Sequence, residues 1–395
     1  MRIAYFLHTA SATDGSSKAL LHLVKEMALR GVTPLVILPC TGEICILLKD
    51  MHIEFYILRW RARPSTYPCY QTLTNKLLFI PRLIGRLLIN TLATFQSIKI
   101  IRDFQPDIIH TNTSILAIGY YTASYLQIPH IWHIREYSAL KFGLLYNYPS
   151  RSKQLSRYKC KDSYTIAITK KIQYLNSLTD WSNSIVIYDG VLPLNTTYYQ
   201  PDKNNYFLFA GTLSEIKGIL PLIDAYAEYC KKQNNPLPLH IAGYGSKEYT
   251  LLIKNKIIQY GIEENVVLLG VRNDILSLYQ NAKALIVPSL LEGFGFITAE
   301  AMFSGCLVIG NNTAGTKEQF DNGKEITGEE IALRYSTQEQ LIQHLIDVTN
   351  NPSLEYEAMI LRGQAVAKQL YSIEENANKI HKFYLFIIQN NKKKS

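Results

Sequence analysis

The feature that most constrains the fold is an alternation of short apolar runs with amphipathic helical patterns, which the chain contains twice. In the first half, the apolar run RIAYFLH (2–8) is followed by a helical pattern that ends at Gly31 and by the apolar run TPLVILP (33–39). Similar apolar runs begin at residues 107, 129, 164 and 184. Strands that alternate with helices form a parallel sheet covered on both faces, so the sequence predicts an α/β protein.

A polar segment with two prolines separates the two alternations. It reads VLPLNTTYYQPDKNN (191–205) and lacks a helical period, and apolar runs then restart at residues 205, 237, 265, 283 and 306. A chain of 395 residues is long enough for two domains of roughly 150–200 residues each. We therefore expect Rossmann-like domains over 1–195 and 196–370. Residues 371–395 should form a helix with a basic tail that crosses back to the N-terminal domain.

The composition is that of a globular protein, with 47% hydrophobic and 18% charged residues, which excludes disordered and fibrous classes. The six cysteines show neither CxxC nor Cys/His spacing, and we expect reduced, buried thiols in a cytoplasmic protein. MRIAYFLHTA lacks the long apolar stretch of a signal peptide. Residues 108–134 carry no charged side chain except histidine, but polar residues and Pro129 interrupt them, so we expect no transmembrane segment.

The net charge of +9 is concentrated in the N-terminal half. Residues 1–195 hold 22 basic and 11 acidic side chains, and eight basic residues without an acidic one lie between Glu54 and Asp103. Six more lie between Glu136 and Asp162. Such an asymmetry suggests an anionic partner, for which we expect a surface other than nucleic acid.

Within the segment 76–104, basic residues stand among leucines, isoleucines and phenylalanines. Helices on either side of Pro81 would place apolar side chains in a membrane interface and basic side chains near lipid headgroups. The segment also fits ordinary domain helices with core leucines and solvated arginines. We expect the N-terminal domain to lie against the inner face of an anionic membrane.

The strongest functional signal is PSLLEGFGFITAE (288–300). Glu292 stands in the loop after an apolar run, and Gly295 allows close backbone approach before a helix that should begin near Phe296. Free N–H groups at a helix N-terminus suit a diphosphate. Carboxylates accept hydrogen bonds from hydroxyls, so Glu300, expected about the first helical turn, is a candidate for a ribose and Glu292 for a transferred sugar. The pattern also occurs as a glycine turn before a helix whose start favours glutamate.

A second signal, GTLSEIKG (211–218), directly follows the first strand of the second half. Gly211 opens this turn, and the ammonium group of Lys217 is a candidate for neutralising donor phosphates. Lysines near helix starts are also commonly solvated. No Asp-x-Asp pair occurs in the chain, so we expect Lys217 and backbone amides to neutralise the phosphates without an obligatory metal or other cofactor.

Two segments of the N-terminal half give weaker signals. In TDGSSKALL (13–21), Gly15 allows close backbone approach, and the hydroxyl and amide of Ser16 are candidates to face the transferring group. A capped helix start is the alternative. In WHIREY (132–137), His133 ends an apolar run, where a histidine is either a ligand or a structural group.

Together these residues resemble glycosyltransferase family 4, a family of retaining enzymes with the GT-B fold. Glu292 and Glu300 match its E-x7-E motif, LSEIKG its phosphate-binding loop, and IVIYDGV its domain-closing strand. SGCLVIGNNTAGTKEQF matches the following strand and loop. The similarity covers nearly the whole chain and is most specific over 185–325. It implies an α/β protein with two facing Rossmann-like domains, a deep cleft between them and a C-terminal helical segment.

The resemblance also implies residue roles. Lys217 would bind the diphosphate, Glu300 the ribose and Glu292 the donor sugar, and His133 would lie near the reacting side of that sugar. Glu292, His133 and Lys217 are thus the candidate catalytic residues. The other residues expected around the donor are Gly15, Ser16, Gly211, Gly295, Phe296, Ile297 and, beside the nucleobase, Val271.

Three positions depart from the family pattern. Thr212 stands where the family usually has an arginine, which removes one of two phosphate-neutralising cations, and Arg272 is one candidate replacement. Asp189 stands for an asparagine, and Asp14 for a glycine. Aspartate fits turns well, so the last two substitutions are compatible with the motif.

These patterns predict a retaining glycosyltransferase of the hexosyltransferase type. It would move a sugar from a nucleotide-sugar donor to a glycan or lipid-linked glycan acceptor in surface polysaccharide synthesis. A nucleotide-sugar epimerase of the same architecture and a catalytically silent homologue that binds an active transferase are the alternatives. The donor sugar, nucleotide, acceptor, linkage and oligomeric state depend on pocket shape and do not follow from these motifs.

Overall fold

The computed structural model describes residues 1–12, 15–61, 78–137, 151–196 and 198–392. Asp14, Cys69, part of the second acid-free segment and the last three tail residues lie outside the described residues. Residues Met1–Gly190 and Ile373–Ser395 form one compact unit, and Val191–Ser372 form a second. Each unit is described by itself below.

The first unit contains a seven-stranded parallel sheet in the order β3-β2-β1-β4-β5-β6-β7. Its strands are β1 (Arg2–Phe6), β2 (Thr33–Leu38), β3 (Glu54–Ile57), β4 (Ile108–Thr111), β5 (His130–Ile134), β6 (Ser163–Ala167) and β7 (Ser184–Val186). Its helices are α1 (Gly15–Leu29), α2 (Glu43–Asp50), α4 (Phe79–Phe104), α5 (Ile118–Leu126), α7 (Arg151–Tyr158), α8 (Lys170–Leu175) and α16 (Ile373–Lys392). The predicted α/β class and parallel sheet are confirmed.

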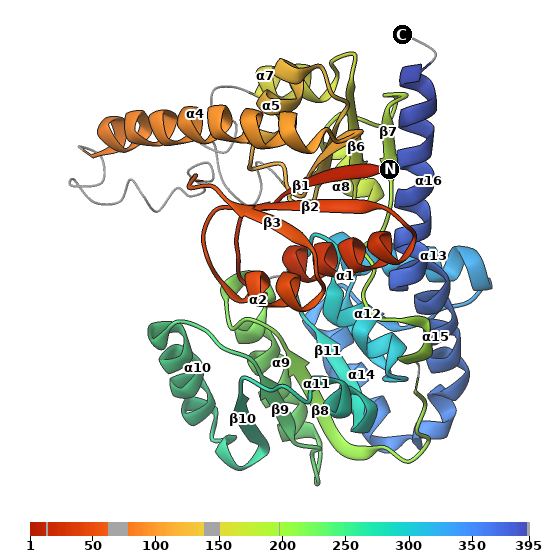
Figure 1. Ribbon diagram of the computed structural model, residues 1–395. Helices are drawn as coiled ribbons and strands as arrows, with labels where there is room; N and C mark the ends of the chain where they lie inside the picture. Colours follow the sequence, from red (N-terminus) through yellow and green to blue (C-terminus); the bar gives the residue numbers. More distant parts are fainter. Residues whose placement is uncertain (13–14, 62–77, 138–150, 197, 393–395) are drawn as a thin grey trace. The chain divides into compact units, whose positions relative to one another are not determined.

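Both faces of this sheet are covered by helices, as the apolar strands require. On one face, side chains of β1, β4 and β5 pack against α1 and against α16, which supplies Ile380, Tyr384 and Ile387. On the other face, strand residues pack against α4 and α5. Figure 1 shows α16 running alongside the sheet of its own unit.

The second unit contains a six-stranded parallel sheet in the order β10-β9-β8-β11-β12-β13. Its strands are β8 (Asn204–Ala210), β9 (Leu239–Ala242), β10 (Val266–Gly270), β11 (Ala282–Val287), β12 (Val308–Asn311) and β13 (Leu333–Tyr335). Its helices are α9 (Ile219–Lys232), α10 (Lys247–Tyr260), α11 (Ile275–Asn281), α12 (Phe296–Phe303), α13 (Ala314–Thr327), α14 (Gln338–Asn350) and α15 (Glu357–Tyr371).

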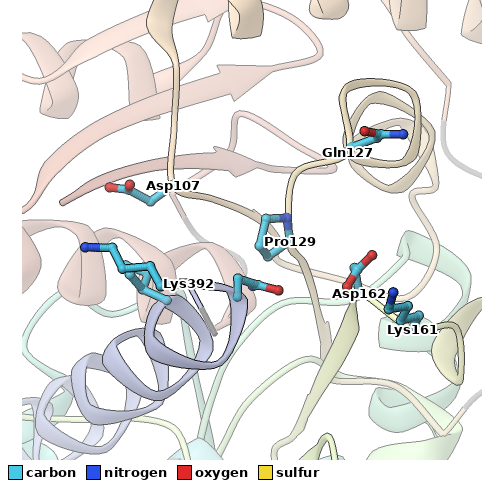
Figure 2. Close-up of a pocket in the computed structure, with 8 residues that line it drawn as sticks. Asp107, Gln127, Pro129, Lys161, Asp162 and Lys392 are labelled. Atoms are coloured by element: carbon cyan, nitrogen blue, oxygen red, sulfur yellow. The ribbon is translucent and has the colours of Figure 1, made fainter. Parts of the chain in front are cut away.

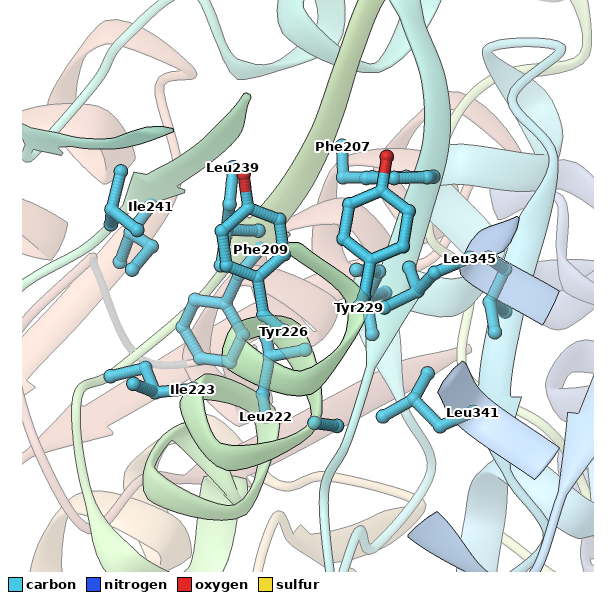
Figure 3. Close-up of a cluster of buried hydrophobic side chains, with 14 of the residues drawn as sticks. Phe207, Phe209, Leu222, Ile223, Tyr226, Tyr229, Leu239, Ile241, Leu341 and Leu345 are labelled. Carbon is cyan, nitrogen blue, oxygen red and sulfur yellow. The ribbon is translucent and has the colours of Figure 1, made fainter. Parts of the chain in front are cut away.

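Aromatic side chains form much of the core of the second unit. Figure 3 shows Tyr226 and Tyr229 of α9 beside Phe207 and Phe209 of β8. Phe207 and Tyr229 make an edge-to-face contact with ring centroids 5.8 Å apart, a geometry that aromatic pairs prefer. This packing fixes α9 against β8, and with it the loop that joins them.

Two local expectations are corrected by the structure. Pro81 does not separate two described helices but lies in the first turn of the 26-residue helix α4, where a missing N–H costs no helical hydrogen bond. All five described cysteines are free thiols, but only Cys45 and Cys306 are buried as expected. Cys40 is exposed, and Cys160 and Cys230 are partly buried. No described helix is long and apolar enough to cross a membrane.

Candidate functional site

The loops after β8 and β11, which are neighbouring strands, bring Lys217 and Glu292 together at the carboxyl edge of the second sheet. The Lys217 ammonium group donates a hydrogen bond to the Glu292 carboxylate, and Ser289 Oγ donates to the same oxygen at 2.9 Å. A backbone bond from Leu290 N to Ile216 O, 2.8 Å long, ties the two loops to each other. The two predicted catalytic residues of this unit are therefore direct partners.

Glycines let these loops approach closely. Gly218 has a φ of +70°, and a Cβ there would lie 2.1 Å from the carbonyl oxygen of Pro288. Gly295 has a φ of +97° and occupies the N-cap position of α12. These are conformations that residues with a side chain rarely adopt, so both positions require glycine for local geometry.

Helix α12 begins at Phe296, as predicted, and Ile297 also lies in its first turn. Glu300 is the fifth residue of the helix and so lies at the start of its second turn, close to the expected place. Its carboxylate accepts a hydrogen bond of 3.2 Å from the hydroxyl of Tyr279 in α11. Burial, and secondarily the Glu300 charge, raises the pKa of Tyr279 well above its ordinary value, so this phenol stays a donor.

Three buried polar side chains gather behind the N-terminus of α12. Gln319 Nε2 donates to the carbonyl oxygens of Phe294 at 2.7 Å and Gly295 at 3.0 Å, which fixes the turn. The hydroxyls of Thr298 and Thr316 are buried and have no hydrogen-bond partner among the described residues. Buried hydroxyls usually have a partner, so these two are exceptions within the described part of the chain.

The remaining residues of this unit that were predicted to contact the nucleotide-sugar donor lie in the loops after β8 and β10. Thr212 is exposed, and Val271 is 69% exposed, so its side chain is available to a flat ring. The guanidinium group of Arg272 forms a two-pronged contact with Asp274, at 2.8 Å from Nε and 2.6 Å from Nη2. The charge of Arg272 is thereby balanced by a carboxylate of its own loop, as the charge of Lys217 is balanced by Glu292.

At the carboxyl edge of the first sheet, His133 of β5 lies beside His110 of β4. His110 Nε2 and His133 Nδ1 are 3.1 Å apart, and both rings are fully buried. Gly15 and Ser16 open helix α1, and the Ser16 carbonyl oxygen accepts a 2.9 Å bond from the side-chain amide of Asn112. The start of α1, which carries two residues predicted to contact the nucleotide-sugar donor, is thus anchored to the residue that follows β4.

A buried ion pair, which the sequence analysis missed, supports this edge. Arg135 follows β5 and pairs with Asp189, and both side chains are almost completely buried. Arg135 Nε also donates to Asn112 Oδ1 at 3.1 Å. Arg135 itself was the signal in the sequence that could have indicated this pair. It directly follows an apolar run, and a buried arginine needs a carboxylate partner. Asp189, seen only as a departure from a motif, is that partner.

A pocket of about 620 Å³ in the first unit is not part of these clusters. Figure 2 shows Asp107, Pro129 and Asp162 among the residues that line it. These residues immediately precede β4, β5 and β6, so the pocket lies at the amino ends of the strands. Ligands of parallel sheets bind at the opposite edge, where His133 lies.

The comparisons with known proteins agree with this reading of the second unit. Residues 198–365 match the family model described as "Glycosyl transferases group 1". The matched region begins just before β8 and ends within α15, and it contains Lys217, Glu292 and Glu300.

Two similar proteins are named glycosyltransferases. The uncharacterized glycosyltransferase MJ1607 of Methanocaldococcus jannaschii is 28% identical over 214 residues, which cover 49% of this chain and 54% of that protein. The O-antigen chain mannosyltransferase RfbU of Salmonella typhimurium is 28% identical over 173 residues, which cover 43% and 47%. The chain thus spans about half the length of these curated relatives.

Solved structures identify the fold. Anabaena Alr3699/HepE in complex with UDP is similar with a TM-score of 0.75, 20% identity, and coverage of 97% of this chain and 99% of that one. The same protein has also been solved in complex with UDP-glucose. The chain therefore has the GT-B fold, with two parallel-sheet Rossmann-like units and a helical C-terminus.

Proposed function

We propose that this protein is a retaining glycosyltransferase of family 4 that transfers a hexosyl group from a nucleotide sugar to a glycan or lipid-linked glycan. The observation that carries the proposal is the Lys217–Glu292 pair beside the glycine turn that opens α12. The O-antigen chain mannosyltransferase RfbU, which is similar to this chain, and the UDP-glucose complex of HepE support a nucleotide-sugar donor and a role in surface polysaccharide synthesis.

Donor binding would exchange the partners of this pair. The Lys217 ammonium group, one quarter exposed, would turn from the Glu292 carboxylate to the donor diphosphate. The first amides of α12 would bind the same diphosphate. Glu292 would then accept hydrogen bonds from sugar hydroxyls, and Glu300, held by Tyr279, would accept bonds from the ribose.

Retention would follow from attack on the same face that the diphosphate leaves. The bond between the anomeric carbon and the phosphate oxygen breaks, the acceptor oxygen bonds to that carbon, and the leaving phosphate oxygen takes the acceptor proton. The protein contributes positioning and charge neutralisation rather than a covalent intermediate. In this scheme the first unit binds the acceptor.

The test is incubation of the protein with a panel of nucleotide sugars and a membrane lipid extract. The proposal requires nucleoside diphosphate release, a product heavier by one hexosyl group, and an anomeric configuration that NMR shows to be retained. An altered nucleotide sugar without nucleotide release would make the protein an epimerase. Donor binding without turnover of any kind would make it a silent binding protein.

Transfer is expected to proceed without a divalent cation, because Lys217 and backbone amides supply the neutralising charge and the chain has no Asp-x-Asp pair. Initial rates measured before and after exhaustive treatment with EDTA should agree within about a factor of two. Loss of activity in EDTA that returns on addition of Mg²⁺ or Mn²⁺ would contradict this neutralisation scheme.

We further propose that the enzyme works at the inner face of an anionic membrane and docks through α4. The apolar side chains of α4 that point to solvent are Ile80, Ile84, Leu87, Leu88, Leu92 and Phe95. They recur every three or four residues and so share one face of the helix, and Leu88 and Phe95 are 67% and 65% exposed. Figure 1 shows α4 extending outward from the sheet of its unit.

Charge favours a membrane as the partner of this apolar face, which we call the α4 stripe. No acidic residue lies between Glu54 and Asp103, and Arg82, Lys99 and Arg102 are exposed on the same helix. A helix with an apolar face and flanking basic residues binds anionic lipid surfaces in two ways. Its apolar side chains are buried in the lipid interface, and its basic side chains are attracted to the anionic headgroups. A soluble partner would need an acidic surface instead.

Binding to vesicles that contain phosphatidylglycerol is expected to be strong at low salt and to fall sharply at 1 M salt. The electrostatic screening length is about 10 Å at 0.1 M salt and only about 3 Å at 1 M. The substitutions Leu88→Glu and Leu92→Glu together should weaken co-sedimentation at least tenfold, since each buried leucine contributes about 1.5–3 kcal/mol. The double variant Arg82→Glu/Lys99→Glu, at two exposed positions of the same helix, should lose a comparable amount, at about 1 kcal/mol for each basic residue removed plus the added repulsion.

The matched control is Leu251→Glu/Leu252→Glu on α10 of the second unit, where both leucines are also exposed. This variant should bind vesicles like the unmodified protein. If the unmodified protein ignores anionic vesicles at low salt, the membrane proposal fails. If it instead forms dimers that the Leu88/Leu92 variant does not form, the α4 stripe is a contact between copies of the chain.

A further inference from the structure

A continuous line of hydrogen-bonding side chains leads to His133 within the first unit. His133 Nδ1 lies 3.1 Å from His110 Nε2, and His110 Nδ1 lies 2.6 Å from the hydroxyl of Tyr384. The Tyr384 hydroxyl is 3.3 Å from that of Tyr5. All four side chains are buried. Tyr384 belongs to α16, so a helix from the end of the chain takes part in this network.

The strand register explains why these side chains meet. Tyr5 of β1 is directly beside His110 of β4, and His110 is beside Ile131 of β5. Alternate residues of a strand share one face, so His133, two residues after Ile131, lies on the face that carries Tyr5 and His110. Helix α16 packs on that face.

Arg135 determines how the protons are placed in this network. Its Nη2 lies 3.4 Å from His133 Nδ1, while its other contacts with Asp189 and Asn112 hold the guanidinium group in place. A guanidinium group has donors only. A proton on His133 Nδ1 would therefore face a permanent cation at close range, which is unfavourable.

The remaining proton positions follow from the inventory of each side chain. If Nδ1 of His133 carries a lone pair, the neutral ring carries its proton on Nε2. His110 must then donate from its own Nε2 to His133 Nδ1, and His110 Nδ1 must accept from the Tyr384 hydroxyl at 2.6 Å. The single proton of Tyr384 then lies on this short contact and not on the longer 3.3 Å contact, in which Tyr384 would donate to the Tyr5 hydroxyl. If these hydrogen bonds ran in the opposite direction, His133 Nδ1 would carry a proton, and this N–H would face the N–H groups of Arg135.

We propose that Arg135, His110 and Tyr384 are positioning residues that hold His133 as the neutral Nε2–H tautomer, so that it donates a hydrogen bond to an uncharged oxygen of the ligand. His133 Nε2 is buried and has no hydrogen-bond partner among the described residues. The assignment of that oxygen to a sugar hydroxyl rests on the proposed function. In this tautomer Nε2 has no free lone pair, so His133 is a donor and not a general base.

Burial and charge keep both rings neutral. Burial, and secondarily the Arg135 charge, lowers the pKa of His110 to about 3. Burial, then Arg135, then His110 lower the pKa of His133 well below its ordinary value. A neutral donor suits a neutral hydroxyl, since neither group then brings a charge into the buried contact.

The test is the ¹⁵N NMR spectrum of the full-length protein labelled at the histidine side chains, with His133 assigned from its absence in a His133→Gln variant. The expected spectrum shows His133 Nδ1 non-protonated and Nε2 protonated at neutral pH. A protonated Nδ1, or a positively charged ring, would overturn the inference. This measurement needs no sugar transfer, so a protein without transferase activity that shows the Nε2–H tautomer would contradict only the proposed function.

Two variants of His110 separate positioning from simple packing. His110→Gln retains an N–H that can donate to His133. This variant should keep His133 in the Nε2–H tautomer, with kcat within about threefold of the unmodified protein. His110→Leu removes the donor and should give a mixture of His133 tautomers, with kcat about tenfold lower and the donor KM little changed. If both variants show the same tautomer and the same kcat, His110 does not position His133.

Discussion

Replacement of Lys217 by alanine is expected to weaken the binding of UDP, or of the nucleotide that proves to be preferred, by about ten- to a hundredfold. A hydrogen bond between an ammonium group and a phosphate contributes roughly 1.5–3 kcal/mol, and each 1.4 kcal/mol is a factor of ten in affinity. Glu300→Gln should cause a loss of similar size, because the carboxylate that would accept the ribose hydroxyls becomes a neutral amide. Isothermal titration calorimetry with UDP and with GDP measures the loss of affinity in both variants.

The Lys217–Glu292 pair supplies an internal comparison. Glu292→Gln releases the Lys217 ammonium group from its carboxylate partner, so nucleoside diphosphate binding should be unchanged or tighter while sugar transfer falls. Lys231→Ala is the matched control, since this lysine is exposed and pairs with Glu228 at the far end of α9. Unchanged diphosphate affinity in both Lys217→Ala and Glu300→Gln would refute the donor-site assignment.

The substitution Asp189→Ala is expected to destabilise the first unit by about 3–5 kcal/mol. Arg135 and Asp189 have side chains that are 5% and 1% exposed, so removal of the carboxylate leaves a buried guanidinium charge without its partner. All three tryptophans, Trp60, Trp132 and Trp181, belong to the first unit. Urea unfolding followed by tryptophan fluorescence therefore reports on this unit.

A pair near the surface of the same unit provides the control. Glu26 and Arg30 of the α1 region are 3.6 Å apart and partly exposed, and Glu26→Ala should cost less than about 1 kcal/mol. A double variant, Arg135→Met/Asp189→Leu, should recover most of the lost stability, since it removes both buried charges. If Asp189→Ala unfolds at the same urea concentration as the unmodified protein, the buried pair does not stabilise the unit.

The sequence located most strands because their apolar runs are short and closed by turn residues. RIAYFLH and KALIVPS became β1 and β11, which differ from these runs only by one or two residues at their ends. The strands β3 and β13 were not expected. Glu54–Ile57 is mostly exposed and Leu333–Tyr335 has three residues, so neither shows a buried-strand pattern. Both are the outermost strands of their sheets.

The donor-site candidates were recognisable because a glycine turn and its following helix are local features. Gly295 and Phe296 occupy the N-cap and first helical positions that the sequence indicates. Partners from other segments were not recognisable. Ser289 and Tyr279 are ordinary residues in the sequence, and only the fold brings their hydroxyls to Glu292 and Glu300.

The sequence by itself determined the α/β class and the candidate residues at strand ends, because periodicity, glycine turns and helix starts depend on neighbours along the chain. Tertiary structure alone decided which charges are paired and which side chains share hydrogen bonds. Arg135 lies 54 residues from Asp189, and His110 lies 274 residues from Tyr384. Such partners meet because parallel strands place their carboxyl ends at one edge and because α16 covers the same face of the sheet. Burial then makes each pairing obligatory, since an unpartnered charge or donor inside a protein is costly.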